Sequence, residues 1–452
     1  MGMMQQTGPP GPPGCGLAAA AFCDPFDQAV TVGKGRAGEL DATRWSGSRM
    51  QPQSPTYQSH PFPIGTATLP ACRAGLPSKV GPEKDTLICD PTSTVHSNHL
   101  LVASAAQNYG ANSYRIRQPF DFAGRTGKIV FDATGYTQQL LGWISLEITE
   151  DPIGTPSYGV LTNDEGGILP QNGLELQFSW HCIAMPTQIS LSAVHVFHDY
   201  ADTVIAASYP NPSPAPCVLA DVDKLNHFEV EVSQDHVRVS VSPMSADGVT
   251  FEPAALMFET PIQLSFSRGS VHLSTHNHAT IKYGKIDAWV TRWDNVGFDG
   301  PVIAAAREYE IADALVSNGD TTNIGYILAD EKDGPAQTFR FTGVDVSGAS
   351  RARLALSSWY WQNGAPIDTY VLKYRLNGGA WHARPLTAGE MTAMTKPVIN
   401  GTDSGGTQGA LGQMVDLPLA ELVAGDNTLE MVTANIPMSY PPGVVNLDLI
   451  ID

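Results

Sequence analysis

The chain has 452 residues and a formal net charge of −19, because 45 acidic residues outnumber 26 basic ones. Such a surface argues against nucleic acid as a partner, since phosphates are neutralised by basic side chains. Only 16% of the residues are charged, and 43 glycines and 34 prolines accompany a hydrophobic content of 42%. This composition favours a turn-rich, all-β protein of two domains. No apolar stretch is long enough to span a membrane.

Residues 1–22 contain Gly-Pro-Pro-Gly-Pro-Pro-Gly and are interpreted as a linker. Their start lacks the basic residues of a signal peptide, so we expect a secreted chain whose signal has been removed, or a fragment of a longer one. A first β region follows over 23–300, then a connector over 301–317. A second β region covers 318–452.

Six cysteines occupy positions 15, 23, 72, 89, 182 and 217, and none forms a Cys-x-x-Cys pair. This spacing argues against zinc ribbons and thioredoxin chemistry. Pairs 72–89 and 182–217 would close loops of modest length and would leave Cys15 with Cys23, although other pairings are possible. The pattern indicates an oxidising compartment.

The segment 227–243 alternates apolar and polar residues around a central two-residue turn, which predicts a β-hairpin. The register of such a hairpin places Val232 opposite Val237 on the core side. It also places Glu231 opposite Arg238 on the other face, which we interpret as solvated.

Several blocks resemble the concanavalin A-like lectin/glucanase superfamily in their order along the chain. They are Cys23-Asp-Pro-Phe-Asp27, FDFAGRTGKIVFDAT at 120–134, NGLELQFSW at 172–180, the hairpin, and a closing strand at 288–298 with Trp293-Asp-Asn-Val near its end. The resemblance implies a β-sandwich over about 23–300 that handles a polysaccharide or glycan. In the glucanases, the strand that 120–134 resembles holds the bound polymer.

The second β region contains VAGDNTLEMV at 423–432, which resembles a strand of galactose-binding-like modules. This short motif implies a second, smaller β-sandwich of the jelly-roll type over 318–452.

Hydrolases of the superfamily, such as those of glycoside hydrolase family 16, use a Glu-x-Asp-x-x-Glu strand whose alternation presents three carboxylates to the sugar. The matching residues here are Glu175, Gln177 and Trp180. Gln177 replaces the aspartate, and no carboxylate stands at the acid/base position, which argues against ordinary family-16 hydrolysis. Another acidic cluster, Glu147 to Asp151, is interpreted as the end of a strand.

Sandwiches of this superfamily often carry a structural calcium between their first and last strands. The resemblance makes Asp24 or Asp27, together with Asp294, the candidate ligands. The alternative is that these aspartates cap turns or accept backbone hydrogen bonds.

His276 and His278 have the spacing of two imidazoles that converge on one metal from a strand. A third ligand would come from His195, His198 or His181. The alternatives are a polar patch bonded to backbone and water, or a groove lining that contacts a glycan.

Aromatic and polar side chains provide the candidate glycan contacts. Trp359 and Trp361 share one face if they lie on a strand, where they would form either a sugar platform or part of a core. The full set of candidate contacts is Trp143, Gln177, Trp180, His278, Trp359 and Trp361.

The leading hypothesis is therefore an extracellular protein that binds a polysaccharide or glycan. The first alternative is a glycosidase or lyase with a rearranged or metal-assisted site, whose catalytic candidates are Glu175, His195 and His276. The second is a non-enzymatic surface or structural protein. The sequence leaves the substrate and the oligomeric state open.

Overall fold

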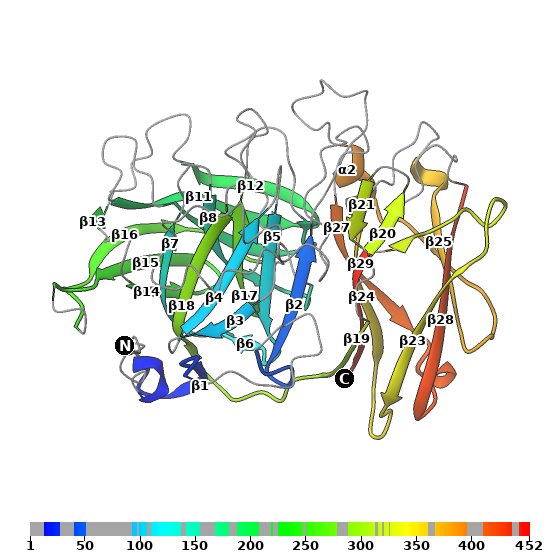
Figure 1. Cartoon of the computed structure of the whole chain (residues 1–452), viewed down its shortest axis with the longest axis horizontal. Coiled ribbons are helices and arrows are strands. Elements are labelled where there is room, and N and C mark those ends of the chain that lie inside the picture. The colour runs from blue at the N-terminus through cyan, green and yellow to red at the C-terminus, as the bar shows by residue number, and fades with distance from the viewer. Residues whose placement is uncertain are drawn as a thin grey trace, which may run out of the picture.

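The structure is a computed structural model of the whole chain. It describes residues 13–27, 40–50, 93–96, 99–105, 110–136, 142–153, 168–179, 188–207, 218–219, 225–246, 250–277, 288–311, 315–318, 321–324, 326–359, 367–395, 410–435 and 443–452. These residues form two β-sandwiches that lie side by side (Figure 1).

The N-terminal sandwich packs two antiparallel sheets against each other. Sheet A has the order β16 (Ala255–Pro261), β15 (His236–Pro243), β14 (Asn226–Val232), β7 (Gly127–Tyr136), β18 (Ala288–Asp299), β4 (His99–Ala105) and β3 (Ser93–His96), with β1 (Ala20–Asp24) paired to β18. Sheet B has the order β12 (Ala201–Ala207), β11 (Gln188–His198), β10 (Gly173–Ser179), β8 (Gly142–Thr149), β17 (Arg268–Asn277), β5 (Gly110–Ile116) and β2 (Trp45–Met50). Two short strands extend sheet B: β13 (Val218–Leu219) pairs with β11, and β6 (Phe120–Asp121) pairs with β17.

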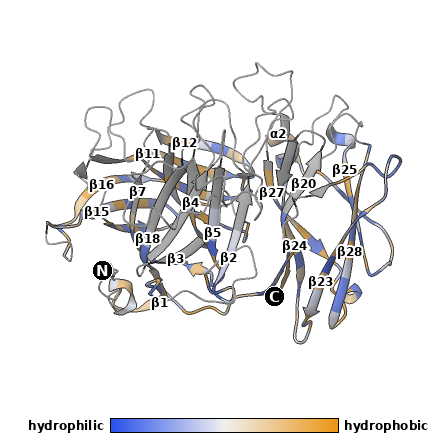
Figure 2. Cartoon of the chain, in the orientation of Figure 1, coloured by the Kyte–Doolittle hydropathy of each residue, from blue (hydrophilic) through white to orange (hydrophobic). Residues whose placement is uncertain are grey.

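The core between these sheets follows from alternation along the strands, which is visible in Figure 2. Phe131, Phe178 and Trp293 meet there with ring centroids 5.5–6.1 Å apart, and each is fully buried. Burying one such side chain contributes about 1.5–3 kcal/mol. Phe131 belongs to β7, so the segment 120–134 contributes its long strand to sheet A, opposite the sheet that contains Glu175. The role of this strand in holding a polymer, which the resemblance implies, stays a prediction.

The C-terminal sandwich also has two sheets. Sheet D has the order β19 (Arg307–Glu310), β29 (Gly443–Ile451), β24 (Ala352–Trp359), β27 (Ala410–Leu417) and β9 (Ile168–Leu169), with β22 (Tyr326–Ile327) on β29. The facing sheet has the order β23 (Gln337–Val344), β28 (Gly425–Ala434), β25 (Val371–Leu376) and β26 (His382–Pro385). The remaining elements are the hairpin β20 (Leu315–Asn318)–β21 (Thr321–Ile324), the helix α2 (Ala388–Thr395) and the 3-10 turns η1 (Pro13–Gly16), η5 (Ile367–Thr369) and η6 (Leu419–Glu421).

The predicted hairpin is confirmed as β14–β15. Val232 pairs with Val237 and Glu231 with Arg238, and the last two form an ion pair of 3.3 Å at the surface. The all-β class is confirmed as well. Among the described residues, no helix is long and apolar enough to cross a membrane.

The structure differs from the expected linker and connector. Cys15 and Cys23 form a disulfide, and β1 begins at Ala20, so residues 13–22 are part of the N-terminal sandwich. The other four cysteines lie outside the described residues. Within the expected connector 301–317, β19 pairs with β29 and extends sheet D.

Candidate functional site

A row of polar side chains crosses sheet B on the face that turns away from the core. Its neighbours along the strands, among them Leu146, Leu174 and Leu273, point into the core, so alternation directs the row outward. All its members are 0–3% exposed. This polar row consists of Ser46 (β2), Arg115 (β5), His272 (β17), Glu147 (β8), Glu175 (β10) and His195 (β11), each directly opposite the next.

Two carboxyl groups meet at the centre of the row. Glu175 accepts hydrogen bonds from Ser145 Oγ at 2.8 Å and from Gln177 Nε2 at 3.1 Å. Glu147 accepts a hydrogen bond from Ser274. Burial raises the pKa of Glu147 well above its usual range, and the charge of Glu175 adds to this. Burial also raises the pKa of Glu175.

His195 continues the row beside Glu175. Its Nδ1 lies 2.9 Å from Asp202 Oδ1, and its ring stacks on Phe197. Burial alone would lower the pKa of His195, but the hydrogen bond to Asp202 and the charge of Glu175 outweigh burial and raise it. This end of the row therefore favours an imidazolium between two acidic side chains.

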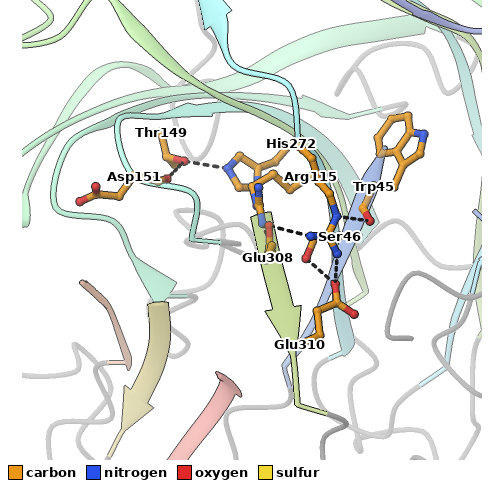
Figure 3. Close-up of polar contacts among 9 residues, drawn as sticks. Trp45, Ser46, Arg115, Thr149, Asp151, His272, Glu308 and Glu310 are labelled. Atoms are coloured by element: carbon orange, nitrogen blue, oxygen red, sulfur yellow. Dashed lines mark hydrogen bonds and ion pairs between the residues drawn. The ribbon is translucent and has the colours of Figure 1, made fainter. Parts of the chain in front are cut away.

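His272 lies on the other side of Glu147, and its hydrogen bonds define its protonation (Figure 3). Thr149 Oγ1 donates a hydrogen bond to the carbonyl oxygen of Asp151 at 2.6 Å, so it accepts one from His272 Nε2 at 2.7 Å. Burial and the neighbouring Arg115 lower the pKa of His272 well below its usual range. The ring is neutral, and Nδ1 is an acceptor without a partner among the described residues.

Strand β19 closes the end of the row formed by β5 and β2. Figure 3 shows Glu308 and Glu310 of β19 reaching Arg115 and Ser46. Arg117 joins them through contacts of 3.1 Å to Glu308 and 3.0 Å to Glu310. Buried guanidinium groups are thus neutralised by carboxylates that come from the C-terminal sandwich.

Beside this contact lies a cavity of about 300 Å³ between the two sandwiches. We call it the junction cavity. Arg115 belongs to both the row and the cavity wall, and Ser270 of the same face also lines it, so the row reaches the cavity at Arg115. Its polar lining includes Arg115, Glu150, Arg268, Ser270, Glu308, Arg353 and Asp452.

The row supplies both halves of acid–base chemistry. Glu147 and Glu175 occupy opposite positions on neighbouring antiparallel strands, where Cβ atoms are about 5 Å apart. Burial raises both pKa values, the charge of Glu175 raises that of Glu147 further, and His195 favours the ionised form of Glu175, so Glu147 can keep its proton while Glu175 is ionised. Ser145 and Gln177 fix the orientation of Glu175.

The structure brings two of the three catalytic candidates together, since Glu175 and His195 are paired across β10 and β11. His276 lies in β17 with its backbone opposite Trp143 of β8, but neither side chain lies within the described part of the structure. His272 is nearer the centre of the row than His276.

Of the candidate glycan contacts, Gln177 is buried at the side of Glu175. Trp359 ends β24 in the C-terminal sandwich, so its backbone is not part of sheet B. Trp180, His278 and Trp361 lie outside the described residues.

Sequence reasoning assigned Glu147 to a strand end. β8 does end at Thr149, but Glu147 lies inside the sheet opposite Glu175. The available signal was the alternation of Ser145, Glu147 and Thr149 on one face, which marks a polar face but does not identify its neighbour.

The calcium candidates lie near one another between β1 and β18. Burial, followed by the charges of Asp132, Asp27 and Asp24, raises the pKa of Asp294 to about 8. Asp24 instead accepts hydrogen bonds from Trp45 Nε1 at 2.7 Å and from the backbone of residue 26. Within the described ranges, no group of three or more His, Cys, Asp or Glu side chains is arranged to hold a metal ion. The calcium site of Asp24, Asp27 and Asp294 stays a prediction.

No known protein family matches the chain, and no curated protein matches it. Among solved structures, the chain is similar to a legume lectin-like domain from Entamoeba histolytica, with 10% identity over 46% of this chain and 87% of that one, and a TM-score of 0.30. It is also similar to the VIP36 exoplasmic/lumenal domain in its Ca²⁺/Man3GlcNAc-bound form (13% identity, 47% and 84% covered, TM-score 0.30). A third similar structure is the Emp46p carbohydrate recognition domain in its metal-free form, with 9% identity over 62% of this chain and 98% of that one, and a TM-score of 0.32.

Proposed function

We propose that the protein binds a polysaccharide or glycan through the outer face of sheet B, outside the cell. The observation that supports this is the polar row, which reaches the junction cavity at Arg115. Burying six polar or charged side chains in one row costs free energy. Apolar side chains at these positions would let the sheet fold without that cost. Such groups concentrate where ligands bind. The Cys15–Cys23 disulfide supports an oxidising compartment.

A polysaccharide and glycan panel tests the proposal with the purified full chain. Arg353 lines the cavity, whereas Arg351 forms an exposed pair with Asp416. We expect Arg353→Gln to weaken binding at least tenfold and Arg351→Gln to leave it unchanged. If no panel member binds, the proposal fails and the non-enzymatic structural alternative is favoured.

The second candidate function is glycosidic bond cleavage, by hydrolysis or elimination. The observation that favours it is the Glu147–Glu175 pair, because a pair of carboxylates in different protonation states provides an acid and a nucleophile or base. In this candidate function, Glu147 of β8 takes the role of the acid/base residue that is missing from β10.

Reducing-sugar release and the absorbance of unsaturated products distinguish cleavage from binding alone. If cleavage occurs, Glu147→Gln and Glu175→Gln should each reduce turnover by about a hundredfold or more while the protein stays folded. Turnover that survives both substitutions would exclude the pair. Metal analysis before and after chelation tests the metal-assisted version with His276 and His278, which predicts stoichiometric metal.

A further inference from the structure

We infer that the junction cavity takes the terminal residue of a neutral glycan chain, an inference that rests on the proposed glycan binding. Its volume of about 300 Å³ lies at the lower end of the range for ligand pockets, which suits one sugar residue rather than an extended segment. Both sandwiches contribute walls, so the cavity exists only in the complete chain.

Exposure decreases from the mouth of the cavity to its floor. Arg268 has a side chain that is 59% exposed, and Glu150 is also exposed. Ser270 is 6% exposed, and the side chain of Glu308 is 3% exposed. A ligand therefore enters past Arg268 and Glu150 and ends against groups that are shielded from water, where hydrogen bonds are strengthened.

The charges of the wall are balanced. Arg353 is paired with Asp452 at 2.8 Å, and Arg268 with Asp121 at 2.6 Å. Arg115 is paired with Glu308, and Arg117 contacts the same carboxylate. An anionic ligand would need a cation that is not already neutralised. The wall offers hydrogen-bond donors on its arginines and acceptors on its carboxylates. Sugar hydroxyl groups can bind both kinds, because each hydroxyl donates and accepts hydrogen bonds.

The inner end of the cavity is closed by the C-terminal sandwich. The buried Arg115–Glu308 pair joins sheet B to β19 at this point, and Arg117 and Glu310 extend the closure. A polymer cannot continue through this contact along the polar row. The arrangement fits a chain end and excludes the middle of a long chain.

Two adjacent alanines provide a matched pair of variants. Ala304 lines the cavity, Ala305 does not, and both are exposed in the extended segment before β19. Ala304→Trp therefore fills the cavity without removing an ion pair, and Ala305→Trp adds the same side chain outside it. Thermal unfolding verifies that both variants fold.

Saturation-transfer NMR on the full chain uses glucose, galactose, mannose and N-acetylglucosamine as neutral probes, with glucuronate and inorganic phosphate as anionic ones. We expect at least one neutral sugar to bind ten times more tightly than either anion. Ala304→Trp should weaken that binding at least tenfold, and Ala305→Trp should not. Partial hydrolysis of a bound polysaccharide should increase binding per unit mass, because it multiplies chain ends.

The outcomes separate this inference from the proposed function. Binding to intact polysaccharide but to no monosaccharide or hydrolysed fragment would overturn the inference and leave glycan binding in place. Unchanged sugar binding by Ala304→Trp would also overturn it, and preference for glucuronate or phosphate would refute the neutral ligand. Absence of all binding would overturn both.

Discussion

Glu147 of β8 lies directly opposite Glu175 of β10, and both carboxyl groups are buried on the outer face of sheet B. Burial is the main cause that raises both pKa values; the charge of Glu175 raises that of Glu147 further, whereas His195 partly offsets the effect of burial on Glu175. Hydrogen bonds from Ser145, Gln177 and Ser274 hold the pair in place. The centre of the polar row therefore binds a proton more readily than an exposed glutamate does.

This pair predicts a stability that decreases as pH rises. A carboxyl group whose pKa is raised by folding holds a proton that the unfolded chain has lost, so its contribution is full below the unfolded pKa and is lost as pH rises through the folded pKa. Glu147→Gln removes this charge from the folded state. Relative to the wild type, the variant should gain about 1–3 kcal/mol in free energy of unfolding at pH 8 and little at pH 4. Urea unfolding at both pH values measures the difference, with the surface variant Glu231→Gln as control.

Asp294 gives a second pH-dependent prediction with a defined window. Its pKa rises from 3.8 to about 8 on folding, so the protein should lose stability between these pH values, with an upper limit of the order of 5 kcal/mol. Asp294→Asn should flatten the dependence in this window and stabilise the protein at pH 8. A melting temperature that calcium raises at pH 8 in the wild type, but not in the variant, would instead show that the aspartates rearrange around the ion.

The ion pair between the sandwiches should be far more sensitive than a surface pair. Glu308→Gln leaves Arg115, which is 3% exposed, without its carboxylate, and we expect a loss of about 3–5 kcal/mol. Asp416→Asn removes the partner of Arg351, whose side chain is 54% exposed, and should cost less than about 1 kcal/mol. Chemical denaturation of the two variants compares them, and equal losses would contradict the burial argument.

The disulfide between Cys15 and Cys23 should stabilise the start of the N-terminal sandwich. It closes a short loop with a sequence separation of 8, for which chain entropy predicts about 2–3 kcal/mol. The double variant Cys15→Ser, Cys23→Ser should have a lower melting temperature than the wild type. A reductant should lower the melting temperature of the wild type toward that of the variant. A variant that melts like the oxidised wild type would show that β1 is held by its pairing with β18 alone.

Local features of the fold follow from the sequence, and features that need distant partners do not. The hairpin register was predictable because one turn sets the pairing of Val232 with Val237. Glu175 was predictable as an outward residue of β10 by alternation. That Glu147 lies next to it depends on β8 and β10 becoming neighbours, and no local pattern specifies which strands pair or in what register.

The same reason explains the closure of the polar row. The sequence of residues 301–317 has no feature that distinguishes a free connector from an edge strand, because β19 forms only when β29, which ends the chain, is present to pair with it. The resulting ion pair between Glu308 and Arg115 could not be derived from the sequence of either segment alone.

Strand β9 and nearby residues of the N-terminal part of the chain belong to the C-terminal sandwich. Leu169 pairs with Leu411 in sheet D, and Phe197 and Tyr200 pack in the C-terminal core, with Tyr200 donating to the carbonyl of Gly412 at 2.9 Å. The C-terminal sandwich therefore cannot complete its interior without residues from the N-terminal part of the chain. We expect the C-terminal sandwich to unfold no later than the N-terminal one in calorimetry, and expression of residues 301–452 alone should yield aggregation-prone material rather than an independent module.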